Sequence, residues 1–272
     1  EAGILELMEQ ALFTPEQAAE AGLVDELRYW DQQEKALKAP DDERLKTVSQ
    51  GTYVKVDADD VGLDGDHTIA VVHAQGMIGG RKNRISPVFG IMMGHESVAA
   101  DLRRARRDDD VEAVVFRVDS RGGEGLASDL IAREVELVAE AKPIVVSMVD
   151  VAASGGYMIA YRGTRLLAVP STITGSIGSI SGKFNVSGLH DTIGVSVDKV
   201  TKGPMALLFD PTRDFTEAER ARFEANHWEG FNQWLTDVAE HRGMSFEAAE
   251  KLAHGRVWTG RQAADNGLID EL

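Results

Sequence analysis

A run near the middle of the chain, VVSMVDVAASGGYMIA at residues 145–160, places a serine between an apolar strand and a helix. The first part is rich in valine, as buried strands are, and Ser154 follows it with Gly155 and Gly156. A serine on a sharp strand-to-helix turn exposes its hydroxyl, and the amides after it point toward whatever lies beside that oxygen. The same triplet is also an ordinary helix cap, so a nucleophile needs support from elsewhere.

Two further glycine-rich turns follow predicted strands. The turn DSRGG at 119–123 comes after the strand expected at 111–118, and TGSIG at 174–178 comes after the one expected at 165–169. Because parallel strands end at one edge of a sheet, we expect these turns to lie near Ser154. Their backbone N–H groups could then form an oxyanion hole. The alternatives are plain tight turns or, less favoured, a phosphate loop, which lacks its usual lysine here.

A serine nucleophile also needs a base. Histidines after Ser154 stand in no recognisable catalytic context: His190, His227, His241 and His254. We expect His227, on a helix rich in aromatic residues, to be half-buried core. A lysine serves only if desolvation lowers its pKa toward neutrality. The candidates by position are Lys183, Lys199 and Lys202, each of which also suits a solvated surface charge.

The composition of the 272 residues, 43% apolar and 27% charged, is typical of a soluble globular protein. A net charge of −16 argues against nucleic acid and against docking on anionic lipid. The absence of cysteine excludes disulfides and thiolate chemistry, and the histidines show no metal-ligand spacing, so we expect no cofactor. No apolar run approaches the ~20 residues of a membrane span. Because the chain starts with Glu1, we expect a fragment.

Strands and helices alternate from Thr68 onward, which predicts an α/β fold with a mostly parallel sheet and right-handed crossovers. Predicted strands lie at 68–73, 111–118, 143–149, 165–169 and 195–200. Predicted helices lie at 95–107, 126–141, 153–161, 216–242 and 245–253, with a short one ending at 189–193. Residues 76–93, which include the basic run 81–84, are expected to be irregular, either a mobile substrate loop or a solvated one.

An internal repeat suggests how the chain is divided. Residues 12–27, LFTPEQAAEAGLVDEL, match residues 257–272, VWTGRQAADNGLIDEL, at nine of sixteen positions without gaps. The second copy closes a unit of about 200 residues. We therefore expect 1–27 to be the tail of an upstream copy, 28–66 a linker, and 67–272 a whole second copy. The linker is expected to be helical at 31–38 and extended at 52–56.

Four stretches in combination resemble the signal peptide peptidase family, also called protease IV, over about residues 68–272. They are SMVDVAASGGYMIA, DSRGG, PSTITGSIGSI and GRVWTGRQAADNGLIDEL. The resemblance implies a crotonase/Clp-protease-like fold of repeated β-β-α and βα units. It also implies a serine protease with a Ser–Lys dyad that degrades cleaved signal peptides. The expected place is the extracytoplasmic side of the cell envelope, as a homo-oligomer attached to the membrane by a segment outside this chain.

By this resemblance Ser154 is the nucleophile, Gly123 and Gly155 supply the oxyanion N–H groups, and Ser176 orients the lysine. Two positions depart from the family pattern. Arg121 stands where the turn usually has proline, and Ala206 stands where short members carry their lysine. Long members with two tandem copies take the lysine from the amino-terminal copy. The internal repeat places this chain with the long members, so we expect the lysine on the upstream copy and little activity from this chain alone.

Two other functions remain open on the sequence. A crotonase-like acyl-CoA enzyme uses the same two-amide oxyanion site without a serine nucleophile. A catalytically inactive copy would serve only in assembly or substrate binding.

Overall fold

The computed structural model describes residues 13–42, 44–56, 59–62 and 65–272. The chain divides into two units, Glu1–Gly65 and Asp66–Leu272, and each is described by itself. The second unit carries all the residues singled out for chemistry.

A six-stranded sheet is the framework of the second unit. Its strands are β1 (Thr68–Gln75), β5 (Val111–Ser120), β6 (Ile144–Ala153), β8 (Ile173–Gly175) and β9 (Val257–Thr259), in that spatial order, with β7 (Arg165–Ala168) also paired to β6. Every pairing is parallel except that of β8 with β9. The predicted mixed α/β fold with a mostly parallel sheet is confirmed. Since β5, β6 and β8 are neighbours, the turns that follow them meet at one edge.

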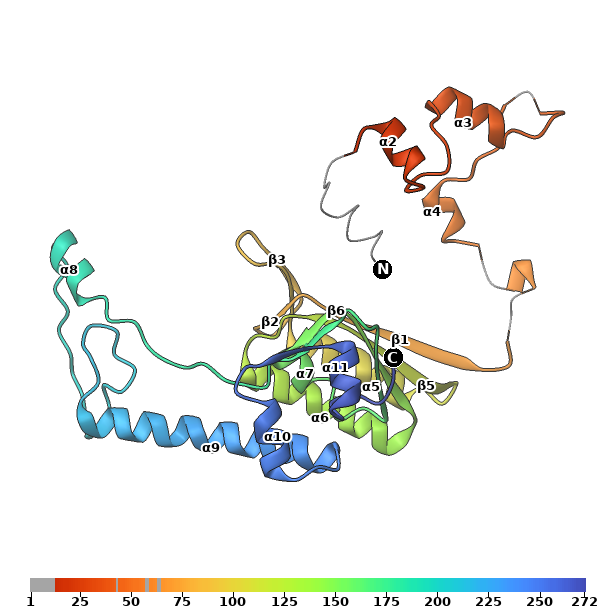
Figure 1. The fold of residues 1–272 in the computed structure, drawn as a ribbon. Coiled ribbons are helices and arrows are strands. Elements are labelled where there is room, and N and C mark those ends of the chain that lie inside the picture. Colours follow the sequence, from red (N-terminus) through yellow and green to blue (C-terminus); the bar gives the residue numbers. More distant parts are fainter. Residues whose placement is uncertain (1–12, 43, 57–58, 63–64) are drawn as a thin grey trace. The chain divides into compact units, whose positions relative to one another are not determined.

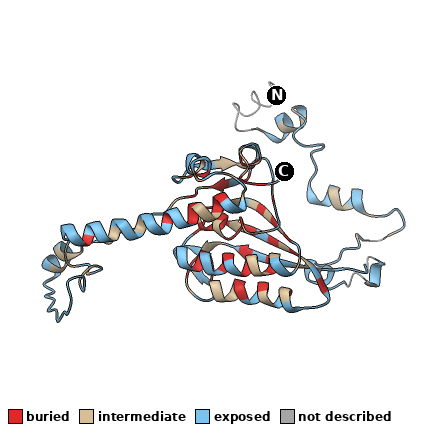
Figure 2. Ribbon diagram, turned by 90° about the horizontal axis from the view of Figure 1, so that it is seen from below, coloured by how far each residue is buried: buried red, intermediate tan, exposed pale blue. Residues whose placement is uncertain are grey.

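Two helices cover the sheet, α5 (His95–Arg107) and α6 (Gly125–Ala141), close to the predicted bounds. Buried residues on α6 recur at helical spacing, as in Ile131, Val135 and Val138. They join a core that includes Phe116 and Val146 of the strands. In Figure 2 the buried residues of this unit lie along the strands and on the helix faces turned toward them.

A long helix, α9 (Glu217–His241), is buried mainly in its second half, where Phe231, Trp234 and Leu235 join the core. It begins with the predicted capping box of Thr216 and Glu219. In Figure 1 its first half runs out from the sheet and helices, and α8 (Ser187–Ile193) lies above the left-hand end of α9 in this view. The helix α10 (Phe246–Leu252) and the terminal α11 (Gly260–Asp265) complete the unit.

Three expectations for the second unit need correction. Residues 76–93 form a small sheet of β2 (Met77–Ile78), β4 (Gly90–Met93) and β3 (Arg84–Ser86), in that order. Its strands are too short and too glycine-interrupted to show a period. Residues 195–200 have strand-forming side chains but no strand beside them, and they are irregular. The helix expected at 153–161 shortens to α7 (Gly155–Met158), because β6 continues to Ala153.

The first unit contains α2 (Pro15–Glu20), α3 (Trp30–Leu37), α4 (Gln50–Tyr53) and a 3-10 turn, η1 (Asp59–Val61). None of α2, α3 and α4 has a buried residue among those described. The helix expected at 31–38 is present as α3. The extended segment expected at 52–56 is wrong, because Ser49 caps α4 there through the amide of Thr52. Within the described residues, no helix combines the length and apolarity needed to cross a membrane.

Candidate active site

Ser154 stands where β6 ends and α7 begins, with a strained backbone of φ 56° and ψ −121°. A positive φ is unusual for a residue with a side chain and persists only where neighbours enforce it. Here the Ser154 N–H donates to the Gly175 carbonyl oxygen at 2.8 Å. The contact ties the serine to β8, in line with the parallel pairing of Ala153 with Gly175. The turn therefore holds Ser154 at the carboxyl edge of the sheet.

The turn after β5 brings a second backbone segment against Ser154. Gly122 has φ +93°, and its N–H donates to the Ser120 hydroxyl at 3.1 Å. A Cβ on Gly123 would lie 1.9 Å from the Ile78 carbonyl oxygen, and one on Gly155 would lie 3.1 Å from the Gly123 nitrogen. The two glycine backbones thus approach closely. Within the described residues, neither the Gly123 nor the Gly155 N–H donates to a protein acceptor.

Ser176 follows β8 and also has a positive φ, 49°. Its N–H donates to the Arg256 carbonyl oxygen at 2.7 Å, and the next residue, Ile177, accepts a hydrogen bond from the Gly255 N–H at 2.9 Å. Ile177 is fully buried. The segment just before β9 therefore fixes the loop that carries Ser176.

One cleft of about 1050 Å³ is lined by all four residues predicted for the site: Gly123, Ser154, Gly155 and Ser176. Much of its remaining wall is apolar, contributed by Leu126, Met158, Ile180, Trp228, Phe231 and Trp234. A hydroxyl and two adjacent free amides thus share a space large enough for several residues of a peptide. The arrangement suits attack on a carbonyl whose developing negative charge the amides would stabilise.

Arg162 ties two helices together beside this cleft. It is almost buried and donates to Glu136 of α6 and to Asp237 of α9, each at 3.1 Å. It also donates to the Tyr161 hydroxyl at 3.0 Å. Asp237 and Tyr161 both line the cleft. Burial raises the pKa of Tyr161 to about 12.

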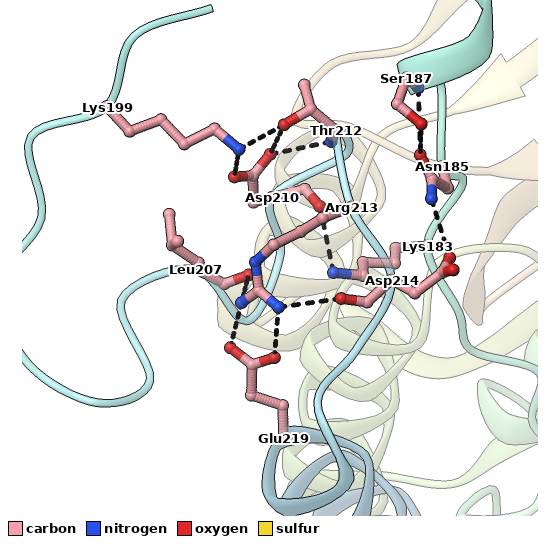
Figure 3. Close-up of polar contacts among 10 residues, drawn as sticks. All are labelled: Lys183, Asn185, Ser187, Lys199, Leu207, Asp210, Thr212, Arg213, Asp214 and Glu219. Atoms are coloured by element: carbon pink, nitrogen blue, oxygen red, sulfur yellow. Dashed lines mark hydrogen bonds and ion pairs between the residues drawn. The ribbon is translucent and has the colours of Figure 1, made fainter.

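Within the part of the chain that the structure describes, no lysine lines the cleft. Lys183 donates to the Asp210 carbonyl oxygen at 3.0 Å, and Lys199 pairs with the Asp210 carboxylate (Figure 3). The hydrogen bond from Lys199 holds the pKa of Asp210 well below its usual range. Lys202 is exposed in the same loop, as is Ala206. Two of the candidate lysines therefore contact Asp210, and the third is exposed to solvent. All three lie on the segments that flank α8.

Of the histidines considered as bases, His227 and His254 line the cleft. His227 is half-buried, but it lies in the cleft wall and not in the expected core, and its Nδ1 lies 2.8 Å from the Ser181 hydroxyl. His241 contacts the Asp237 carbonyl oxygen through Nδ1, and His190 lies on α8. The described residues contain no group of three or more His, Asp or Glu side chains able to hold a metal ion.

Several residues around the cleft carry no sequence signal for it. Asp237 and Tyr161 line the cleft but stand in no motif, and their places depend on packing between distant segments. The aromatic residues of α9 carried a usable signal, because their helical spacing predicts one buried face. Arg121 is exposed in the turn beside the site.

The chain is similar to known proteins over nearly its whole length. The family model described as "Peptidase family S49" matches residues 136–272. "Serine protease SPPA, chloroplastic" of Arabidopsis thaliana is 35% identical over 269 residues, which is 97% of this chain and 40% of that protein. "Protease 4" of Salmonella typhi is 35% identical over 266 residues, 95% of this chain and 41% of that protein. The chain thus spans about two fifths of these relatives.

Among solved structures, a "1510-N membrane-bound stomatin-specific protease" has a TM-score of 0.47 at 15% identity, over 76% of this chain and 80% of that one.

Proposed function

The chain belongs to peptidase family S49, and from this premise we propose that it is the serine-bearing part of a signal peptide peptidase. The observation that carries the proposal is the strained Ser154 in one cleft with Gly123 and Gly155. Because the chain spans about two fifths of its relatives, the proposal concerns the full-length protein.

In the proposed reaction the Ser154 hydroxyl oxygen attacks the carbonyl carbon of the scissile peptide bond. A neutral lysine accepts the hydroxyl proton and passes it to the leaving amine. The N–H groups of Gly123 and Gly155 donate to the oxyanion of the tetrahedral intermediate. The intermediate collapses to an acyl-enzyme, which water then hydrolyses to release the second product and regenerate the serine.

We propose that the lysine comes from a homologous upstream copy of this unit, with Ser176 orienting it. The proposal is supported by the internal repeat and by the lack of a lysine among the described residues of the cleft. It also fits the engagement of Lys183 and Lys199 with Asp210, away from Ser154. The upstream copy is thus an obligatory partner, and the assembled enzyme is proposed to be a homo-oligomer.

The proposed substrates are extended apolar peptides, including cleaved signal peptides. The apolar wall of the cleft supports this class, because it would bury apolar side chains beside the scissile bond. Such peptides arise at membranes during secretion. The proposed place of the catalytic unit is therefore the extracytoplasmic side of the cell envelope, with membrane attachment through a segment outside this chain.

The decisive test is labelling of the full-length protein by a serine-directed phosphonate, followed by mass spectrometry. We expect the label on Ser154, and we expect Ser154→Ala to lower peptide cleavage by at least about a thousandfold. Ser187→Ala is the matched control, since this serine lies on α8 away from the cleft. Its cleavage rate should equal that of the wild type. Label on another serine would overturn the assignment.

The same variants distinguish a serine protease from the two other functions, a crotonase-like enzyme and an inactive assembly domain. A crotonase-like enzyme would bind a CoA thioester and keep its activity in Ser154→Ala. An inactive assembly domain would take up neither label nor thioester. The 272-residue chain alone is expected to cleave peptides at a small fraction of the full-length rate. If it cleaves them well and Lys202→Ala abolishes that cleavage, the base lies in this chain and the upstream assignment is wrong.

A further inference from the structure

The hairpin of β3 and β4 exposes four large apolar side chains within seven residues. Ile85 and Val88 are 83% and 81% exposed, and Phe89 and Ile91 are 58% and 52% exposed. Ile85 and Ile91 are direct partners across the antiparallel pair, so they lie on one face of the hairpin. Val88 and Phe89 form its tip. An apolar group of this density on a surface marks an interaction site.

This apolar tip belongs to an ordered hairpin. The Ser86 hydroxyl accepts hydrogen bonds from the Val88 and Phe89 N–H groups at 3.3 and 3.2 Å. At the base of the hairpin, Met92 and Met93 are buried in the second unit. The fold therefore fixes the tip in an exposed position.

The hairpin is also locally basic in a strongly acidic chain. Residues 76–94 contain Arg81, Lys82 and Arg84 and no aspartate or glutamate. One carboxylate, Glu96 of α5, pairs with both Arg81 and Lys82, which leaves an excess of positive charge. The net charge of −16 argued against anionic lipid for the surface as a whole. The structure gathers these cations toward the base of the hairpin, where Arg84 pairs with Met92, so that argument does not hold for the hairpin.

We propose that the β3–β4 hairpin docks on an anionic lipid bilayer. Val88, Phe89 and the Ile85–Ile91 pair enter the boundary between headgroups and acyl chains, and the basic residues face the anionic headgroups. A bilayer fits these features better than a protein partner does. Lysine is depleted at protein interfaces, whereas anionic lipid headgroups favour both lysine and arginine above apolar side chains that enter the bilayer.

Docking there would orient the catalytic cleft. The Ile78 N–H of β2 donates to the Gly122 carbonyl oxygen at 2.9 Å, and the Ile78 carbonyl oxygen accepts from the Glu124 N–H at 3.0 Å. The sheet that carries the hairpin is thus hydrogen-bonded to the turn beside Ser154. A bilayer-bound hairpin would hold that turn near the membrane surface. The inference does not require protease activity, and its tests measure lipid binding alone.

The absence of cysteine makes a site-specific probe straightforward. Phe89→Cys, labelled with an environment-sensitive dye, is mixed with vesicles of equal parts phosphatidylglycerol and phosphatidylcholine. We expect the emission to rise and to shift to shorter wavelength, as the dye enters an apolar medium. Phe184→Cys is the matched control, since Phe184 is 87% exposed on the segment before α8. Its dye should not respond, and an equal response at both positions would overturn the proposal.

A second measurement is flotation of the 272-residue chain with the same vesicles. Val88→Asp with Phe89→Asp should lower the bound fraction at least about tenfold. The control pair Phe184→Asp with Val200→Asp should bind as the wild type does. Unchanged circular dichroism verifies that each variant is folded. Failure of the wild type to float refutes the proposal. The proposal is also refuted if sedimentation shows that the wild type is a dimer and that the Val88/Phe89 double variant is a monomer, because the tip is then a protein interface.

Discussion

The chain contains one sequence motif twice, and its two copies have the same local structure in different surroundings. Thr14 and Gln17 cap α2 reciprocally at 2.9 and 3.3 Å, and Thr259 and Gln262 cap α11 at 3.0 and 3.3 Å. Each helix is followed by a glycine with positive φ. The resemblance extends from backbone angles to individual hydrogen bonds.

The copies differ in what covers them. Leu268 and Ile269 are buried, whereas their counterparts Leu23 and Val24 are 52% and 41% exposed. In the second copy, β9 pairs with β8, and the Asp270 carboxylate accepts the Leu166 N–H at 2.7 Å. The motif thus specifies its own helix and turn, while burial depends on a sheet beside it. That a sheet of an upstream copy covers 13–27 stays a prediction.

The largest expected difference between the copies concerns the matched leucines. Leu268→Ala should lower the free energy of unfolding by about 3 kcal/mol, because it opens a cavity in the core. Leu23→Ala should change it by less than about 0.5 kcal/mol in this chain. Urea denaturation of the two variants measures both. Equal losses of unfolding free energy in the two variants would mean that Leu23 is buried in solution and that the two copies do not differ in burial.

The matched aspartates should differ in acid. Burial alone would raise the pKa of Asp270, but hydrogen bonds from Arg242 and the Leu166 amide outweigh it and lower that pKa below its usual range. A lowered pKa stabilises the fold at pH above the unfolded value, and the stabilisation is lost as pH falls through the folded pKa. Asp270→Asn should therefore cost about 1–2 kcal/mol at pH 7 and flatten the loss of stability below about pH 4.

Asp25→Asn serves as the control for that measurement, since Asp25 is exposed. Denaturation midpoints from pH 7 to pH 3 should coincide for Asp25→Asn and the wild type. If both variants lose less stability than the wild type as the pH falls, the acid sensitivity does not come from Asp270 and the assignment is wrong.

The smallest expected difference concerns the caps. Thr259→Ala and Thr14→Ala each remove one side-chain acceptor from a helix N-terminus, worth about 1 kcal/mol locally. Only Thr259→Ala should lower the global midpoint, because α11 contributes the buried Ala263 to the core. Thr14→Ala should appear only as faster amide exchange in α2. A global shift from both would show that the two units unfold together.

Much of the fold was predictable because its signals are local. The amphipathic period of 95–107 gave α5 with its observed bounds, and the Thr216–Glu219 pair gave the start of α9. The irregular segment 195–200 was mispredicted because a strand needs a partner that its own residues do not encode. The small sheet at 76–93 was missed for the opposite reason, since pairing with neighbours made strands from residues without a period.

The candidate site likewise contains features with a local sequence signal and features that depend on contacts between distant segments. The turns that carry Ser154 and Gly123 were predictable because each follows a predicted strand, whereas the roles of these residues were expected only from the family resemblance. The contact that fixes Ser176 was beyond sequence reasoning, because Arg256 reaches it only through the antiparallel pairing of β8 with β9. The Arg162 contacts to Glu136 and Asp237 likewise join residues on helices far apart in the chain.

The backbone of Ser154 has a consequence for the stability of the protein. A residue with a side chain at φ 56° and ψ −121° costs of order 1–3 kcal/mol that glycine would largely avoid. We therefore expect Ser154→Gly to raise the melting temperature of the protein while it removes the nucleophile and with it the proposed activity.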